Sequence, residues 1–259
     1  MFASVIVRSC LVLQTIRIDL LQQLTMFFAT LTKALVIYYF IAMVLQLNIR
    51  FNMVNSFIQK KSKTNKEDTM IVTDYIKPLK VEDDLYFLCR QHYRICNGAR
   101  LLNWAFGLQI LASVSVTLAD ILFQSYYLYH ILFQKVPYVT ALMILRPVTW
   151  LIDESIQTYL LVIACANLCD SANSTPVLLH HFRNLINDIE LENHIQMYSL
   201  QMLHQKIKFT ALGFFAIDYT LIYSIIGVVT TYLVIFIQFD QSSTGELEAT
   251  NDTCSSVKY

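Results

Sequence analysis

The feature that most constrains this chain is an uncharged stretch near its end. Nineteen residues, from Leu221 to Phe239, carry no formal charge, and the run stops at Asp240. A helix needs about 20 apolar residues to cross a hydrocarbon core of roughly 30 Å. Helices of soluble domains keep one polar face and rarely run so long without a charge. The stretch therefore predicts a membrane-spanning helix, with the rest of the chain packed around it or holding its inner end.

The composition extends this prediction to the whole chain. Of the 259 residues, 56% are hydrophobic and 15% are charged, whereas globular proteins average about 25% charged residues. The chain holds five Gly and four Pro, a scarcity that favours long helices over frequent turns. The net charge of zero argues against a nucleic-acid partner. We expect an all-α, polytopic membrane helix bundle with the lipid bilayer as its environment.

Apolar runs and the charges between them divide the chain into regions. The predicted spans are Met26–Leu47, Leu101–Tyr129, Tyr138–Cys169 and Leu221–Phe239. Residues 1–25 form an uncertain N-terminal segment, which we interpret as the remnant of an upstream helix. Residues 26–169 form membrane helices, with a cytoplasmic loop at 48–100. Two cytoplasmic anchor helices at 170–208, a last helix at 209–239 and an extracellular tail at 240–259 complete the chain. We expect Asp218 and Gly227 to interrupt the last helix. The piece at Phe209–Thr220 then lies outside the lipid, on the inner side.

The charges predict the orientation. From Arg50 to Arg100 there are ten Lys or Arg and six Asp or Glu, so the positive-inside rule places this segment in the cytoplasm. It includes an amphipathic helix with His92 on its apolar stripe. With four spans, the acidic tail then lies outside, where Asn251-Asp252-Thr253 forms a candidate N-glycosylation site at Asn251. We expect a multi-pass protein with an extracellular C-terminus.

Cysteine and histidine residues indicate no metal site and no cofactor. The six cysteines show no disulfide or zinc spacing, and Cys165 and Cys169 have no nearby pair to complete a zinc site. His180 and His181 are adjacent on a helix and point in different directions. The chain also lacks His-Glu-x-x-His, a Ser–His–Asp cluster and a phosphate-binding Gly loop, so an enzyme is not expected.

The third span carries one polar, aromatic face. Ionisable groups at membrane depth are costly and usually face a cavity or one another. One interpretation is therefore an ion pair of Arg146 with Asp153 or Glu154 that holds helices together. The other is a ligand pocket, in which aromatic faces and hydrogen-bonding groups combine around a small polar molecule. Its candidate residues are Tyr126, Tyr127, Trp150, Asp153, Glu154 and Gln157. Tyr126 and Tyr127 also suit an aromatic belt at the membrane interface.

Three blocks of residues resemble the insect gustatory receptor family. The last helix carries the signature Thr231-Tyr232, five apolar residues, then Gln238-Phe239. A block before it matches at Ser199–His204, Phe209–Ala211, Gly213–Phe215, Ile217-Asp218 and Thr230. Upstream, Leu47-x-x-Arg50-Phe51-x-x-Val54-Asn55 is similar to the family's inner extension of the fourth helix, with Val54 where Leu is usual. The resemblance covers roughly Met26 to Gln241.

The resemblance implies a tetrameric, ligand-gated, non-selective cation channel of seven-helix subunits. This chain would supply the fourth to seventh helices, so we expect it to be N-terminally incomplete: a partial sequence, a short isoform or a degraded copy. The last helix of each subunit lines the pore, and Gln238 and Phe239 lie at its constriction. Thr231, Ile235 and Gln238 then share one helix face that Phe239 borders. A ring of Phe side chains blocks ions by dewetting, and Gln amides offer dipoles once the ring widens.

The expected function is taste reception. The chain would be a plasma-membrane channel subunit gated by a small tastant, a sugar or a bitter compound, in a homo- or heterotetramer with sister subunits. One alternative is a G-protein-coupled chemoreceptor, although Asp-Arg-Tyr and Asn-Pro-x-x-Tyr are missing and the charges predict the opposite orientation. Another is a truncated receptor fragment without function. For Gln238 and Phe239, the alternative role is to mark the helix end at the membrane interface.

Overall fold

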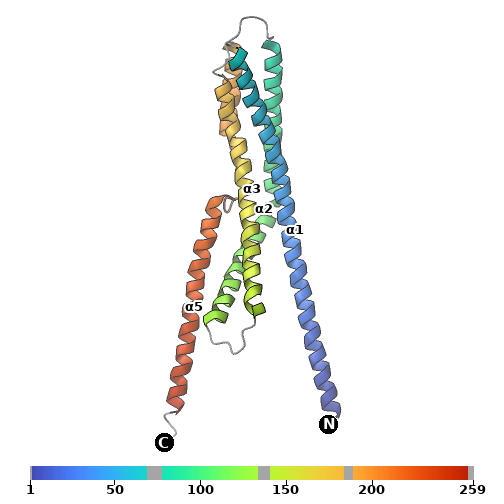
Figure 1. Ribbon diagram of the computed structural model, residues 1–259, viewed down its shortest axis with the longest axis vertical. Helices are drawn as coiled ribbons and strands as arrows, with labels where there is room; N and C mark the ends of the chain where they lie inside the picture. Colours follow the sequence, from blue (N-terminus) through green and yellow to red (C-terminus); the bar gives the residue numbers. More distant parts are fainter. Residues whose placement is uncertain (1, 69–77, 134–140, 184–188, 256–259) are drawn as a thin grey trace. The chain divides into compact units, whose positions relative to one another are not determined.

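The computed structural model describes residues 2–68, 78–133, 141–183 and 189–255, and it is helical almost throughout these ranges (Figure 1). This confirms the all-α prediction. The helices of the described ranges are α1 (Phe2–Asp68), α2 (Pro78–Phe133), α3 (Ala141–Arg183), α4 (Ile189–His204) and α5 (Tyr219–Ser255). Between α4 and α5 one isolated β-bridge joins Thr210 to Ala216.

The chain forms two compact units, residues 1–40 and residues 41–259. In the first unit the backbone is one uninterrupted stretch of α1 from Phe2 onward, so residues 1–25 contribute no separate helix within the described part. The physical reason is that Phe2–Asp68 contains neither Gly nor Pro, and charged residues alone do not break a helix. The unit that begins at Ile41 contains the rest of α1 and all of α2, α3, α4 and α5.

Among the described residues, four helices are long and apolar enough to cross a membrane, which confirms the predicted number of spans. Their qualifying segments are Phe28–Lys60, Tyr86–Phe133, Met143–His181 and Tyr219–Ser242. The first three have 33, 48 and 39 residues, well beyond the roughly 20 that a bilayer requires. These three helices therefore continue past the hydrocarbon core. The sequence predicts amphipathic segments next to the membrane at these extensions.

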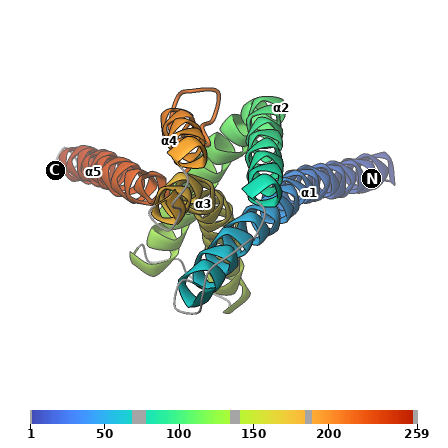
Figure 2. The same ribbon diagram turned by 90° about the horizontal axis from the view of Figure 1, so that it is seen from above.

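The core of the second unit forms around α3. This helix packs against α2, α4 and α5, and in the view of Figure 2 it lies among them. Its interior side chains include Leu161, Val162, Cys165 and Leu168, each at most 2% exposed. Apolar side chains at a spacing of three and four residues thus bring one face of α3 into contact with three neighbours.

A polar seam joins the C-terminal half of α1 to α3. The Asn55 amide donates to the Ser171 carbonyl at 2.7 Å, and the Thr175 hydroxyl donates to Asn55 Oδ1 at 2.7 Å. Ser171 in turn donates to Asn52 Oδ1 at 3.0 Å. Asn55 and Thr175 are buried, so these bonds satisfy polar groups that would otherwise be costly to enclose.

A buried histidine completes the hydrogen bonding of α3 where a proline interrupts it. Pro176 lies inside the helix and has no N–H, so it cannot bond to the carbonyl of Ala172 four residues earlier. Instead, His92 Nε2 lies 3.4 Å from the Ala172 oxygen. Because a carbonyl only accepts, the hydrogen sits on Nε2, and Nδ1 is free to accept from the Cys96 thiol at 3.5 Å. The sequence predicts two helices in 170–208; the first is the continuation of α3 to Arg183, and the second is α4.

The last helix begins at Tyr219, not at residue 209. Asp218 caps it: its carbonyl accepts from Leu221 N at 3.1 Å, and its carboxylate accepts from Thr220 N at 2.9 Å. Asp218 thus separates the inner piece from the span, as expected. Gly227 does not interrupt, because α5 continues through it to Ser255.

We predict that His92→Leu destabilises the protein by about 1–3 kcal/mol, since the Ala172 carbonyl is then buried without a partner. Pro176→Ala restores an N–H to that carbonyl, so the double variant should recover most of the loss. The measurement is the thermal unfolding midpoint in nanodiscs for each variant, with the exposed His180→Leu as control. If the effects of the two substitutions simply add, His92 does not replace the missing N–H.

Candidate pore face and ligand pocket

Helix α5 packs through one face. Leu221 and Ile225 are 6% and 7% exposed. Farther along, the rings of Phe236 and Tyr126 meet edge to face at 5.9 Å, and the Gln241 amide lies 3.5 Å from the Tyr129 hydroxyl. These contacts hold α5 against α2 and define its inner side.

The other face of α5 carries the residues predicted to line a pore. Thr231 and Gln238 are exposed, Ile235 is 36% exposed and Phe239 is 68% exposed. Tyr232, the remaining signature residue, is about half exposed beside them. Spacings of three and four residues place Thr231, Ile235 and Gln238 together, on the side away from Phe236.

The exposed polar face is longer than the sequence motif indicates. Counting back from Thr231 in steps of four, three and four residues reaches Gly227, Ser224 and Thr220, and all three are exposed. We call Thr220, Ser224, Gly227, Thr231 and Gln238 the polar stripe. Its first three members lie outside the sequence signature, although the same helical spacing predicts them.

Two hydroxyl groups of the polar stripe share one arrangement, whereas that of Thr220 donates to the Asp218 carboxylate. Ser224 donates to the Thr220 carbonyl at 2.9 Å, and Thr231 donates to the Gly227 carbonyl at 2.8 Å. Each hydroxyl hydrogen is therefore satisfied within the helix, while the oxygen can still accept from water or contact a cation. Gln238 differs, because within the described part of the chain its amide has no hydrogen-bond partner. An exposed amide of this kind favours contact with water over contact with lipid.

The residues of the predicted ligand pocket lie in separate places in the structure. Tyr126 and Tyr127 line a cavity of about 610 Å³ between α2 and the start of α3, where Arg146 also contributes. Trp150 is half-buried one turn after Arg146. Glu154 and Gln157, at 2% and 4% exposed, lie farther along α3, and Asp153 is exposed.

The two acidic residues of this region have partners other than Arg146. Thr117 donates to Glu154 Oε2 at 2.8 Å, and Gln157 donates to Asp153 Oδ2 at 2.6 Å. Arg146 precedes them by seven or eight residues on the same helix, a rise of roughly 10–12 Å at 1.5 Å per residue. That separation explains why the expected Arg146 ion pair does not form among the residues described here.

Two polar atoms on this part of α3 are buried without a partner in the described structure. They are the indole Nε1 of Trp150, a donor, and the amide Oε1 of Gln157, an acceptor. A spacing of seven residues places them on the same face of the helix. Unsatisfied buried groups are rare, and a ligand with both an acceptor and a donor would satisfy both atoms.

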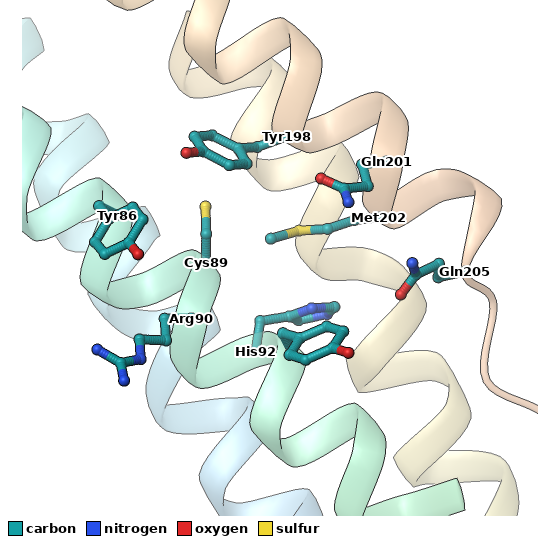
Figure 3. Close-up of a pocket in the computed structure, with 9 residues that line it drawn as sticks. Tyr86, Cys89, Arg90, His92, Tyr198, Gln201, Met202 and Gln205 are labelled. Carbon is teal, nitrogen blue, oxygen red and sulfur yellow. The ribbon is translucent and has the colours of Figure 1, made fainter.

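A second cavity, of about 220 Å³, lies between α2 and α4 (Figure 3). Tyr86, Cys89 and His92 line it from α2, and Tyr198 and Met202 from α4. Sequence analysis did not predict it, because α4 reaches α2 only through the packing of both helices on α3. No group of three His, Cys, Asp or Glu residues suited to a metal ion occurs among the described side chains.

Comparison with known proteins agrees with this architecture. The family model for 7tm chemosensory receptors matches residues 1–243. The putative gustatory receptor 28b of Drosophila melanogaster is 31% identical over 170 residues, covering 63% of this chain and 36% of that protein. The gustatory receptor for bitter taste 66a of the same species is 28% identical over 180 residues, covering 66% and 33%. The matched part is thus about a third of the length of these relatives.

The match to the family model covers nearly the whole chain, and the helices that carry it are the membrane-spanning ones described above. The family is described as one of chemosensory receptors. The relatives are insect gustatory receptors, and the resemblance drawn from the three sequence blocks is confirmed. This chain belongs to the 7tm chemosensory receptor family.

Proposed function

We propose that this chain is a subunit of a tastant-gated, non-selective cation channel in the plasma membrane, with α5 as the wall of the pore. The observation that carries the proposal is the polar stripe on the exposed face of α5. In a spanning helix, a polar face that its own subunit leaves uncovered needs either water or another subunit. Four copies, identical or mixed with sister subunits, would enclose the stripe around a central aqueous path.

The chemistry of the stripe suits weak selection among cations. From Tyr219 to Phe239 the helix carries no charged residue, so the path would offer hydroxyl, carbonyl and amide oxygens but no fixed charge. Oxygen dipoles stabilise cations without strong binding, which allows conduction. At the far end, the exposed Phe239 would form an apolar ring next to the Gln238 amides. That ring would close the path by dewetting, and its widening would expose the amides.

The ligand site in this proposal is the region from the Tyr126–Tyr127 cavity to Gln157. Its aromatic walls, Arg146 and the two unsatisfied atoms of Trp150 and Gln157 suit a small bitter compound or a sugar. One relative is named for bitter taste. The C-terminal tail would lie outside the cell; the Asn251 side chain of its sequon lies outside the side chains that the structure describes.

The stripe predicts one-sided access of water to α5. With cysteine at Thr231 or Gln238, a membrane-impermeant thiol reagent should react, faster at Gln238 when applied from outside. Cysteine at Leu233 or Ile237, on the more enclosed side, should react at least about tenfold more slowly, as expected for lipid or protein contact. Equal rates at all four positions would show that α5 is a simple membrane anchor.

Phe239→Ala should raise the resting conductance of the assembled full-length receptor. A loss of about 1 kcal/mol of closed-state stabilisation corresponds to a roughly fivefold change in the closed-to-open ratio. The matched control is Tyr223→Ala, which removes an equally exposed aromatic ring at the other end of α5. Unchanged resting current in the Phe239 variant would remove this residue from the gate.

Trp150→Phe keeps an aromatic ring, smaller than the indole, but removes the indole N–H. If the ligand accepts a hydrogen bond from this group, the half-activating tastant concentration should rise about fivefold, the equivalent of a bond worth roughly 1 kcal/mol. The control is Trp104→Phe, which alters the chain's other tryptophan at a 77% exposed position. An identical dose–response curve for both variants would place the ligand elsewhere.

A further inference from the structure

The chain between α4 and α5 folds into a compact structure that we call the link, residues 205–218. Its backbone forms a tight hairpin, in which Ile217 N donates to Phe209 O at 2.9 Å and Ala211 N donates to Phe215 O at 3.0 Å. At the turn, Leu212 and Gly213 have φ values of 50° and 81°. A leucine rarely adopts a positive φ, so surrounding contacts must hold this conformation.

Asparagine side chains of two helices bond directly to the link backbone. From α3, Asn173 Oδ1 accepts from Ile207 N at 3.3 Å, and its amide lies 3.5 Å from Ile207 O. From α2, Asn103 Oδ1 accepts from Thr210 N at 3.0 Å. Both helices therefore fix the link by its backbone, so the side chains of the link itself do not determine these contacts.

A glycine of α2 allows the turn of the link to approach closely. A Cβ at Gly107 would lie 3.1 Å from Leu212 Cδ2 and 3.4 Å from the Leu212 backbone nitrogen. The first of these distances is shorter than ordinary van der Waals contact, so a methyl group there would require the Leu212 side chain to shift by a few tenths of an ångström. By contrast, a Cβ at Gly98, also on α2, would meet its nearest neighbour, Leu47 Cδ2, at 3.8 Å.

Open space adjoins the point where the link passes into α5. A cavity of about 320 Å³ is lined by residues of α2 that include Ser115, by Phe215 and Ala216 of the link, and by residues of α5 that include Thr220 and Ser224, so the first members of the polar stripe lie at the edge of this cavity. This hollow is open to the surface at exposed residues such as Thr220 and Ser224, and a helix next to unfilled space can tilt without displacing side chains. The start of α5 is thus held through the link, while its next turns have room to move.

We propose that Asn103, Gly107 and Asn173 are positioning residues for α5: they clamp the link to α2 and α3 so that α5 tilts about its first turn. This inference rests on the proposed pore role of α5, because tilting changes the path that the polar stripe lines. The clamp transmits the position of the intracellular half of α2 and α3 to the pore helix. None of the three residues belongs to the stripe or to the proposed ligand site.

The test compares three variants of the full chain: Gly107→Ala, Gly107→Ala with Leu212→Ala, and Gly98→Ala as the matched control. Each also carries Ser115→Cys and Ser224→Cys, which lie on opposite walls of the cavity. The first readout is the yield of the disulfide between these two cysteines, counted as loss of thiols reactive with maleimide-polyethylene glycol after denaturation. The second, in the same variants without the added cysteines, is the tastant dose–response curve of the assembled receptor.

We expect Gly107→Ala to lower the disulfide yield and shift the half-activating concentration by roughly threefold or more, because overpacking displaces the link. Leu212→Ala should restore both values, and Gly98→Ala should match the parent. A Gly107→Ala protein that behaves like Gly98→Ala would overturn the proposal, as would a defect that Leu212→Ala fails to repair. If no receptor conducts, the pore proposal fails, whereas the disulfide yields still decide whether the clamp positions α5.

Discussion

A hydrocarbon core offers no water to a backbone N–H or C=O, and this constraint governs the architecture of the chain. The four candidate spans of the described chain satisfy this constraint as long helices, in which each backbone N–H donates to the carbonyl four residues earlier. The same cost arises where a backbone group is buried in protein, and Pro176, in the part of α3 predicted to lie beyond the membrane, leaves the buried Ala172 carbonyl without its usual donor. The ring of His92 supplies that donor from α2. A local defect in one helix thus becomes a specific contact between two helices.

The same constraint separates two kinds of polar side chain. Some are enclosed and bonded, such as Asn55 with Thr175 and Glu154 with Thr117. These pairs join helices within the subunit, and their burial makes loss of either partner costly. Others are left uncovered on α5, where the hydroxyls bond back to their own helix and the Gln238 amide has no bond in the part of the chain that the structure describes. The first kind stabilises the fold, while the second kind is available for water, ions or another subunit.

The link between α4 and α5 connects these two features. It is the largest non-helical segment among the described residues, and it lies between the α4 helix packed on α3 and the uncovered pore helix. Its bonds to Asn103 and Asn173 come from helices that also contribute to the core. A rigid connection of this kind allows the position of α5 to follow that of the helix bundle, even though one face of α5 does not pack against the bundle.

The sequence by itself determined the helices, the number of spans and the family, because apolar runs and the Thr231–Phe239 signature are local patterns. It also placed Thr231, Ile235 and Gln238 on one face and separated the inner piece at Asp218. Other interactions were not evident: the partners of Asn55, His92 and Glu154, the contacts of the link with Asn103 and Asn173, and the cavity between α2 and α4. Those contacts join residues as far as 120 positions apart, as in Asn55 and Thr175. Helical periodicity shows which residues share a face, but only the packing of α2, α4 and α5 on α3 decides what that face meets.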